Sequence, residues 1–214
     1  MSFQKFFTGK EVASFEEAIK KIGLPKSTRF VKMEQVHGVG IAEVNTNGAK
    51  SSDLTFFVPK VDATYTSEKN LFLSVKSADC LPILIYGDGF VAAAHAGRKG
   101  TSQKILTLLL NELNQKYRLI HILQTGLIPL QVWFGPCICK NCYQIDRTTD
   151  THYDLITENM AQIFDFFATN GLDPKKTLRL EVENHCTLHE PKRYYSYRAT
   201  GPGVKMNYSF IGII

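Results

Sequence analysis

The fold depends most on residues 77–97, which read SADCLPILIYGDGFVAAAHAG. Two apolar runs, ILIY and FVAAA, lie on either side of a Gly-Asp-Gly triplet at positions 87–89. Short apolar runs around such a triplet are typical of an antiparallel β-hairpin with a tight turn. We therefore expect two neighbouring strands, with Cys80 at the start of the first and His95 at the end of the second.

The register of this hairpin decides which residue faces Cys80. A two-residue loop at positions 87–88 sets Cys80 directly opposite His95, where Cβ atoms lie about 5 Å apart. A loop at positions 88–89 sets Cys80 opposite Gly97 instead. In both registers Cys80 and His95 lie at the open end of the hairpin, close enough to share a metal ion or a proton.

The composition is that of an ordinary globular protein. The 214 residues are 44% hydrophobic and 21% charged, and no linker divides them. No apolar run approaches the roughly 18 residues that span a bilayer, and the first residues lack the apolar core of a secretory signal. We expect a cytoplasmic protein without a membrane partner.

The charge indicates which kinds of ligand the protein could bind, and the cysteine content indicates the state of its thiols. The net charge is +5, but the basic residues are scattered, which disfavours nucleic acid and leaves anionic small substrates open. The five cysteines are an odd number, and nothing in the sequence implies export. We therefore expect reduced thiols that are available as ligands or nucleophiles.

The pattern of apolar residues predicts many strands and three helices. Ser14 and Glu17 form a capping box that opens a helix ending near Gly23. Further helices are expected at residues 101–117 and 151–169, and an exposed loop at 45–53. Strands are expected at residues 29–36, 40–44, 54–58, 63–66, 71–76, 83–86, 90–94, 130–134, 178–182, 194–198 and 207–213. The lack of strict alternation favours an α/β domain with a mixed or antiparallel sheet.

Three predicted strand ends carry His37, Cys80 and His95. A thiolate and two neutral imidazoles are a suitable three-ligand set for Zn²⁺, with a fourth position left for water. The same residues could act without metal, with Cys80 as nucleophile and a histidine as its base. The simplest alternative is a buried thiol beside two hydrogen-bonded histidines.

Basic residues mark two further segments. Residues 96–101 join His95 to the next helix, and Arg98 and Lys99 there would favour a phosphate or acidic group. The alternative is a plain turn with solvated basic residues. In the predicted strand 194–198, Ser196 and Arg198 share a face, and Arg198 binds substrate or forms a structural ion pair.

Residues 137–142 read CICKNC and bring three thiols together. A structural zinc site needs four ligands, which Cys186 with His185 or His189 could complete, although nothing in the sequence links these segments. We expect instead that residues 135–136 turn the chain and that some of the cysteines line the pocket.

Several motifs occur in the order seen in one known family. They are Gln35-Val36-His37-Gly38, Ala78-Asp79-Cys80-Leu81-Pro82, His95-Ala96-Gly97, Gly135-Pro136, Cys142-Tyr143, Cys186-Thr187 and Ser196-Tyr197-Arg198. From about residue 30 to the carboxyl end, the chain resembles the YfiH-type family. This family is also called laccase-domain, multicopper polyphenol oxidase or purine nucleoside phosphorylase. The resemblance implies that His37, Cys80 and His95 bind zinc.

The resemblance also implies a fold and an activity. The expected fold is a layered α/β/β/α arrangement with mixed, largely antiparallel sheets, shared with some bacterial toxin cysteine hydrolases, as a single catalytic domain over residues 1–214. The expected reactions are phosphorolysis of adenosine, inosine, guanosine and methylthioadenosine, and deamination of adenosine. The expected partners are a nucleoside and phosphate, bound by a monomer or homodimer. The expected substrate-binding residues are Arg98, Lys99, Tyr143 and Arg198. Tyr143 or Tyr197 would stack on the base.

The chain departs from the family around the expected metal ligands. Arg98 and Lys99 stand where the family has Trp and Arg, Gln144 replaces a glutamate and Ala199 replaces an arginine. Three alternatives therefore stay open: a copper-containing phenol oxidase, a Cys80 amide hydrolase in cell-wall precursor editing, and a non-catalytic ligand-binding protein. Metal binding is the firmer expectation, because the three ligands are kept.

Overall fold

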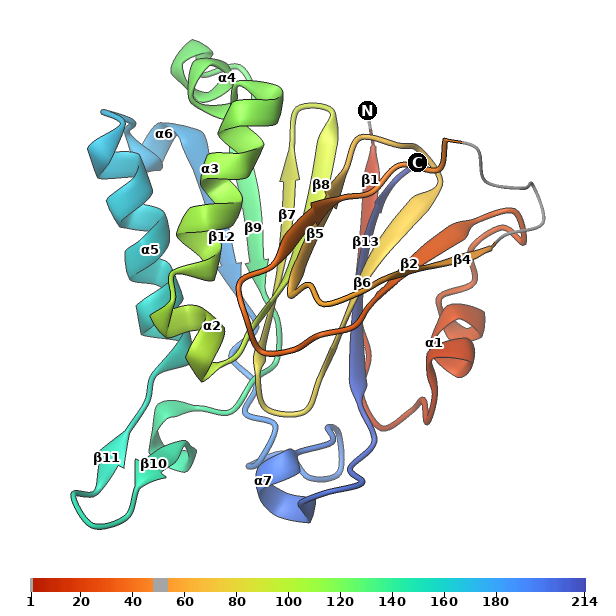
Figure 1. Cartoon of the computed structure of the whole chain (residues 1–214), viewed down its shortest axis with the longest axis vertical. Helices are drawn as coiled ribbons and strands as arrows, with labels where there is room; N and C mark the ends of the chain where they lie inside the picture. Colours follow the sequence, from red (N-terminus) through yellow and green to blue (C-terminus); the bar gives the residue numbers. More distant parts are fainter. Residues whose placement is uncertain (1, 48–53) are drawn as a thin grey trace.

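Two β-sheets lie face to face, with helices on both outer sides (Figure 1). The computed structural model describes residues 2–47 and 54–214, so positions 48–53 of the expected loop at 45–53 lie outside the described residues. Both sheets combine parallel and antiparallel pairs. The expected layered α/β/β/α arrangement is confirmed.

The six-stranded sheet carries the hairpin at its centre. Its order is β12 (Leu178–Val182), β9 (Leu130–Phe134), β7 (Leu81–Gly87), β8 (Phe90–Ala96), β5 (Ala63–Thr66) and β3 (Ile41–Glu43). The five-stranded sheet has the order β1 (Phe3–Phe7), β13 (Asn207–Ile213), β6 (Leu71–Ser77), β2 (Arg29–Met33) and β4 (Thr55–Val58).

The helices cover the two outer faces (Figure 1). The six-stranded sheet is flanked by α2 (Arg98–Ser102), α3 (Ile105–Tyr117), α4 (Leu119–Thr125), α5 (Leu155–Thr169) and α6 (Pro174–Thr177), and the five-stranded sheet by α1 (Phe15–Ile22). The short elements η1 (Lys140–Cys142), β10 (Gln144–Asp146), β11 (Thr151–His152) and α7 (Tyr197–Thr200) lie at one end. Within residues 2–47 and 54–214, no helix has the length and apolar character needed to cross a membrane.

Three hydrophobic clusters fill the three layer interfaces. Along β7, Ile83 and Ile85 belong to the cluster on the helical side, while Leu84 and Tyr86 belong to the cluster between the sheets. Successive side chains of a strand point to opposite faces, so a strand buried on both sides must be apolar throughout. This explains the uninterrupted apolar runs of the hairpin.

The hairpin adopts the second of the two expected registers. Gly87 pairs with Phe90 and Leu81 with Ala96, so the loop is Asp88-Gly89 and the register that sets Cys80 opposite His95 is wrong. Gly89 takes a positive φ of 79°, which glycine adopts without steric cost. The pairing places Cys80 at the level of Gly97.

Other boundaries differ from the sequence predictions. The predicted strand at 194–198 is wrong, because Ser196 caps α7 with its Oγ and Arg198 lies on that short helix. Helix 101–117 is instead two helices, α2 and α3, separated at Lys104, which has a left-handed φ of 66°. Helix α5 starts at Leu155, after an Asp154 cap, rather than at residue 151.

Candidate active site and metal centre

His37, Cys80 and His95 converge at one end of the two sheets. His37 lies in the loop after β2, Cys80 in the turn between β6 and β7, and His95 near the end of β8. One ligand atom from each side chain lies within 4.8 Å of the others. The two imidazole rings are 4.8 Å apart and nearly perpendicular, at 83°. The structure therefore brings together all three expected ligands.

A buried carboxylate shapes the loop that carries His37. The backbone amides of residues 36–38 all donate to the Asp62 carboxylate, at 3.2, 3.0 and 2.7 Å. The Gln35 side chain bonds both the amide and the carbonyl of Lys76, at 2.9 and 2.7 Å. These bonds hold His37 in a left-handed conformation, with φ at 58°, that non-glycine residues rarely adopt.

The same Asp62 orients His95. Its Oδ1 lies 2.8 Å from His95 Nδ1, and the two side chains are only 0% and 3% exposed. Because Nδ1 is engaged, Nε2 is the nitrogen left for Cys80 or a metal. A metal-binding histidine usually has such a carboxylate partner on its second nitrogen. Sequence reasoning missed Asp62, although an acid between Val61 and Ala63 at the start of a buried strand was a visible signal.

Close backbone packing brings the Cys80 sulfur against the other two ligands. A Cβ on Gly97 would lie 3.0 Å from Cys80 Sγ and 3.2 Å from His37 Cδ2, so this position has no room for a side chain without displacement. Before Cys80, Asp79 has a φ of 97°, and its carboxylate accepts from Thr187 Oγ1 at 2.6 Å. The turn that carries the Cys80 thiol is therefore held by its packing against Gly97 and by the hydrogen bond between Asp79 and Thr187.

The three groups alter each other's ionisation. Burial opposes ionisation of Cys80, but hydrogen bonds from His37 and His95 lower the pKa of its thiol to about 7. Burial likewise opposes protonation of His95, but hydrogen bonds to Asp62 and Cys80 raise the pKa of its imidazole to about 9. A thiolate is therefore available near neutral pH, either as a ligand or as a nucleophile.

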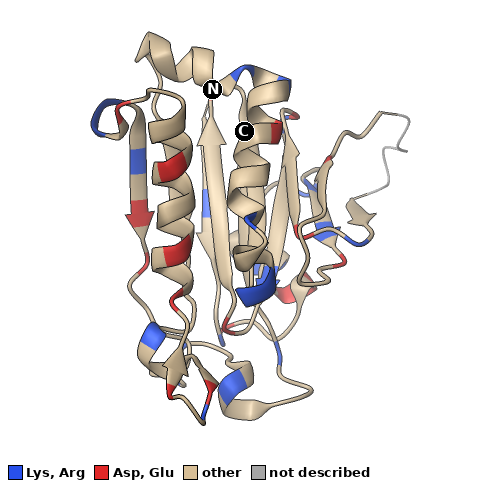
Figure 2. Ribbon diagram, turned by 60° about the vertical axis from the view of Figure 1, so that its left-hand side comes forward, with Lys and Arg blue, Asp and Glu red and all other residues tan. Residues whose placement is uncertain are grey.

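A cavity of about 1070 Å³ opens over these residues. Its lining includes five basic residues: Lys76, Arg98, Lys99, Arg147 and Arg198. Asp79 is the acidic residue among the lining, and its carboxylate is already bonded to Thr187 and to the Arg198 amide. Figure 2 shows Lys and Arg on several segments at its lower end, with Asp and Glu among them, at the end where Figure 1 places β10 and α7. The pocket favours an anionic ligand.

The remaining expected substrate-binding residues also line this pocket. Arg198 lies over the Tyr143 ring, 5.6 Å from its centroid, and donates to the Gln144 carbonyl at 2.8 Å. Tyr197 is 54% exposed at the rim. Arg198 therefore braces Tyr143, and within residues 2–47 and 54–214 it has no partner for the structural ion pair that was the alternative expectation.

Comparison with known proteins identifies the family. The model of the family described as multi-copper polyphenol oxidoreductase laccase matches residues 10–213. The chain belongs to this family. The purine nucleoside phosphorylase YlmD of Bacillus subtilis is 31% identical over 209 residues, covering 86% of this chain and 70% of the relative. A purine nucleoside phosphorylase of Streptomyces coelicolor is 33% identical over 141 residues, covering 64% of this chain.

The chain spans about half the length of two of the curated relatives it matches. The aligned region covers 52% of the Streptomyces coelicolor relative and 45% of one from Rickettsia conorii. Among solved structures, YlmD from Geobacillus stearothermophilus has a TM-score of 0.73 at 25% identity, covering 92% of this chain and 77% of that chain. YfiH from Bacillus licheniformis has a TM-score of 0.71 at 23% identity, covering 92% of this chain and 79% of that chain, and shows the shared fold.

The cysteines at 137–142 do not line the main pocket, which corrects the sequence prediction. Of the five cysteines in the chain, Cys80 is the one in that lining. Cys139 and Cys142 instead lie beside Cys186 and His189 in this laccase-family member, in a second group of metal-ligating side chains. The two segments were not linked by anything visible in the sequence.

Proposed function

We propose that the chain is a zinc-dependent purine nucleoside phosphorylase that also deaminates adenosine. Its proposed substrates are adenosine, inosine, guanosine and methylthioadenosine, each with inorganic phosphate. The observation that carries this proposal is the convergence of His37, Cys80 and His95 beneath a basic pocket. The names of the relatives support the phosphorylase activity.

The three donor groups fit zinc. Catalytic zinc sites use three protein ligands, and a thiolate with two imidazoles is such a set. The bond between His95 and Asp62 fits too, because it fixes the imidazole with Nε2 free. A multicopper site would need more histidines than the two that meet here. Zinc held by these residues would supply Lewis-acid chemistry at neutral pH.

Phosphate fits the basic side of the pocket. Arg98 and Lys99 both line the cavity and are exposed to it at the start of α2, directly after the His95 segment. In phosphorolysis, a phosphate oxygen forms a bond to the ribose C1′ while the bond from C1′ to the purine nitrogen breaks. The electron pair leaves with the purine, which takes up a proton. The two cations would hold the phosphate and orient its oxygen toward C1′.

The purine fits the aromatic side of the pocket. Tyr143 offers a ring face that is held in place by Arg198. Tyr197 is an exposed residue of the same lining and offers a second aromatic ring. Aromatic rings stack favourably on planar ligands. In this proposal the base stacks on a tyrosine while the phosphate binds the basic residues of the same pocket.

The test measures products with and without phosphate. Wild-type protein incubated with each nucleoside should release free purine only when phosphate is present, and should release ammonia from adenosine in both conditions. Cys80→Ala should lose the zinc bound by His37 and His95 and both activities, whereas His121→Gln, at an exposed position on α4, should keep them. A zinc-loaded wild-type protein that releases neither purine nor ammonia would reject the proposal.

A second candidate function rests on a specific contact. Cys80, His95 and Asp62 are arranged as thiol, imidazole and carboxylate, the order that activates a nucleophile in thiol hydrolases. The chain would then cleave amide bonds without metal. Amide hydrolysis that survives chelation, together with labelling of Cys80 by a thiol-selective acylating probe, would favour this candidate over the zinc enzyme.

A further inference from the structure

We propose that Cys139, Cys142, Cys186 and His189 form a second zinc site, closed and structural, outside the catalytic pocket. The four side chains come in two pairs with the same spacing, Cys-x-x-Cys at 139–142 and Cys-x-x-His at 186–189. Two such pairs on separate turns are the usual pattern of structural zinc sites. This inference is independent of the proposed function, because none of the four residues lines the catalytic pocket.

The fold brings the two pairs together through the backbone. Strands β9 and β12 are parallel neighbours, so the segments that follow them leave the sheet at the same edge. An isolated bridge then joins Cys137 to Cys186, with the Thr187 amide donating to the Cys137 carbonyl at 3.1 Å. This bridge sets the first pair, Cys139 just before η1 and Cys142 at its end, against the second.

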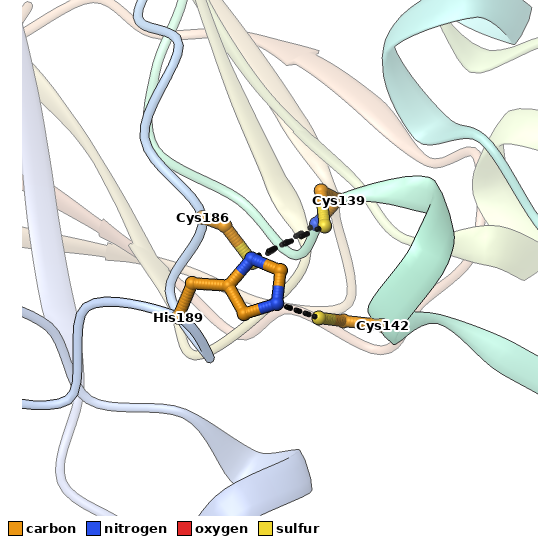
Figure 3. A group of neighbouring side chains, drawn as sticks. All are labelled: Cys139, Cys142, Cys186 and His189. Carbon is orange, nitrogen blue, oxygen red and sulfur yellow. Dashed lines mark hydrogen bonds between the residues drawn. The ribbon is translucent and has the colours of Figure 1, made fainter.

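The four side chains gather in one place, and the two ring nitrogens of His189 face the sulfurs of Cys139 and Cys142 (Figure 3). All four ligand atoms lie within 4.8 Å of one another. His189 Nε2 is 3.1 Å from Cys142 Sγ, and its Nδ1 is 3.8 Å from Cys139 Sγ. Donor atoms around a tetrahedral zinc ion lie about 3.4–3.8 Å apart. Small side-chain rotations would therefore place one nitrogen and three sulfurs around one ion.

Neighbouring groups support the same four ligands. The Cys139 amide donates to Cys186 Sγ at 3.4 Å, an outer contact of the kind that orients a metal ligand. His185, the other histidine of this loop, is engaged with Glu190 at 2.8 Å and with Arg193 at 3.0 Å. His189 is therefore the histidine that completes the site.

The position of this site gives it a structural purpose. Tyr143 directly follows Cys142 and lines the catalytic pocket, and Thr187 directly follows Cys186 and bonds to Asp79. Zinc bound between the two turns would hold both residues in place. The segments concerned contain little regular structure, η1 being a single short turn, so a metal ion is an efficient way to fix them.

The test separates the two zinc sites by their sulfur content. In Cys80→Ala, which removes a catalytic-site ligand, we expect about one zinc per chain, with X-ray absorption showing three sulfur neighbours at about 2.3 Å and one nitrogen. His189→Gln in the same background should lose this zinc. The matched control His185→Gln should keep it.

The wild-type protein gives an answer even if a variant fails to fold. With both sites filled, the averaged zinc shell should contain about two sulfur neighbours per ion, whereas the catalytic site alone gives about one. Three sulfurs per ion would keep this proposal and count against zinc in the catalytic site. Three results would overturn the proposal. They are a folded Cys80→Ala protein without zinc, a wild-type zinc shell with about one sulfur per ion, and a disulfide between Cys139 and Cys142 in mass spectra.

Discussion

Replacing Asp62 by asparagine should weaken both the fold and the metal centre. Oδ1 accepts from the His37 amide and from His95 Nδ1, and Oδ2 accepts from the amides of Val36 and Gly38. In Asp62→Asn one of these oxygens becomes an NH₂ group, which donates and cannot accept. With the NH₂ in place of Oδ2, the amides of Val36 and Gly38 lose their acceptor. With it in place of Oδ1, the His37 amide loses its acceptor and His95 must present Nδ1 as an acceptor, which puts its proton on Nε2.

The size of the effect follows from these contacts. An unsatisfied donor costs about 1–3 kcal/mol when it is buried, and these amides are only partly buried, so Asp62→Asn should lower the free energy of unfolding by about 1–3 kcal/mol. This is a measurable share of the roughly 5–15 kcal/mol of a typical protein. Since Asp62 also orients His95, zinc affinity should fall by about 10–100-fold.

The assay combines two measurements on one pair of variants. Urea unfolding of metal-free protein gives the loss of stability, and competition with a chromogenic chelator gives the zinc affinity. Asp88→Asn, in the exposed hairpin loop, is the matched control and should change neither. If Asp62→Asn unfolds at the wild-type urea concentration and binds zinc equally well, the role assigned to Asp62 is refuted.

Three further predictions concern the same site. Gly97→Ala should keep the fold but weaken zinc binding by about tenfold, since its Cβ would press on Cys80 and His37; competition with a chelator measures this, and unchanged affinity would contradict the packing. In metal-free protein, alkylation of Cys80 should accelerate as pH rises through about 7, rather than the roughly 8.5 of a free thiol, because ionisation is favoured by the histidines. Peptide mass spectrometry would measure the rate of Cys80 alkylation against pH. His95→Gln should move the midpoint of this pH profile upward, and an unchanged midpoint would count against the contact between His95 and Cys80. Arg98→Ala should raise the KM for phosphate by about tenfold, equal to about 1.4 kcal/mol, with little change in kcat, and a loss confined to kcat would argue for another role.

The sequence was most informative where local pattern and burial agree. The apolar runs of β7 and β8 predict the hairpin, and the ends of these strands predict that Cys80 and His95 meet. The register was less certain, because the triplet at 87–89 allows two loops with the same number of residues. The structure selects the loop in which Gly89 takes the positive φ.

Local sequence patterns did not predict contacts between segments that are far apart in the sequence. Strand β1 was not predicted, because its five residues are only half-buried and become a strand by pairing with β13 at the far end of the chain. Asp62 was missed because its partners come from the loop after β2 and from β8. Tertiary pairing, and not local preference, decides such positions.

The second group of ligands illustrates the same limit. The Cys-x-x-Cys and Cys-x-x-His spacings are visible in the sequence, but they are separated by the whole of α5, α6 and β12. Only the parallel pairing of β9 with β12 shows that the two turns share one sheet edge. With this pairing in hand, the choice of His189 over His185 follows from side-chain contacts.

The most direct test of the central claim is a crystal structure with anomalous scattering recorded at the zinc absorption edge. We predict a peak about 2.3 Å from Cys80 Sγ and about 2.0–2.1 Å from His95 Nε2 and a ring nitrogen of His37. Zinc-containing, active crystals without a peak at this position would contradict the claim that these three side chains hold the catalytic ion.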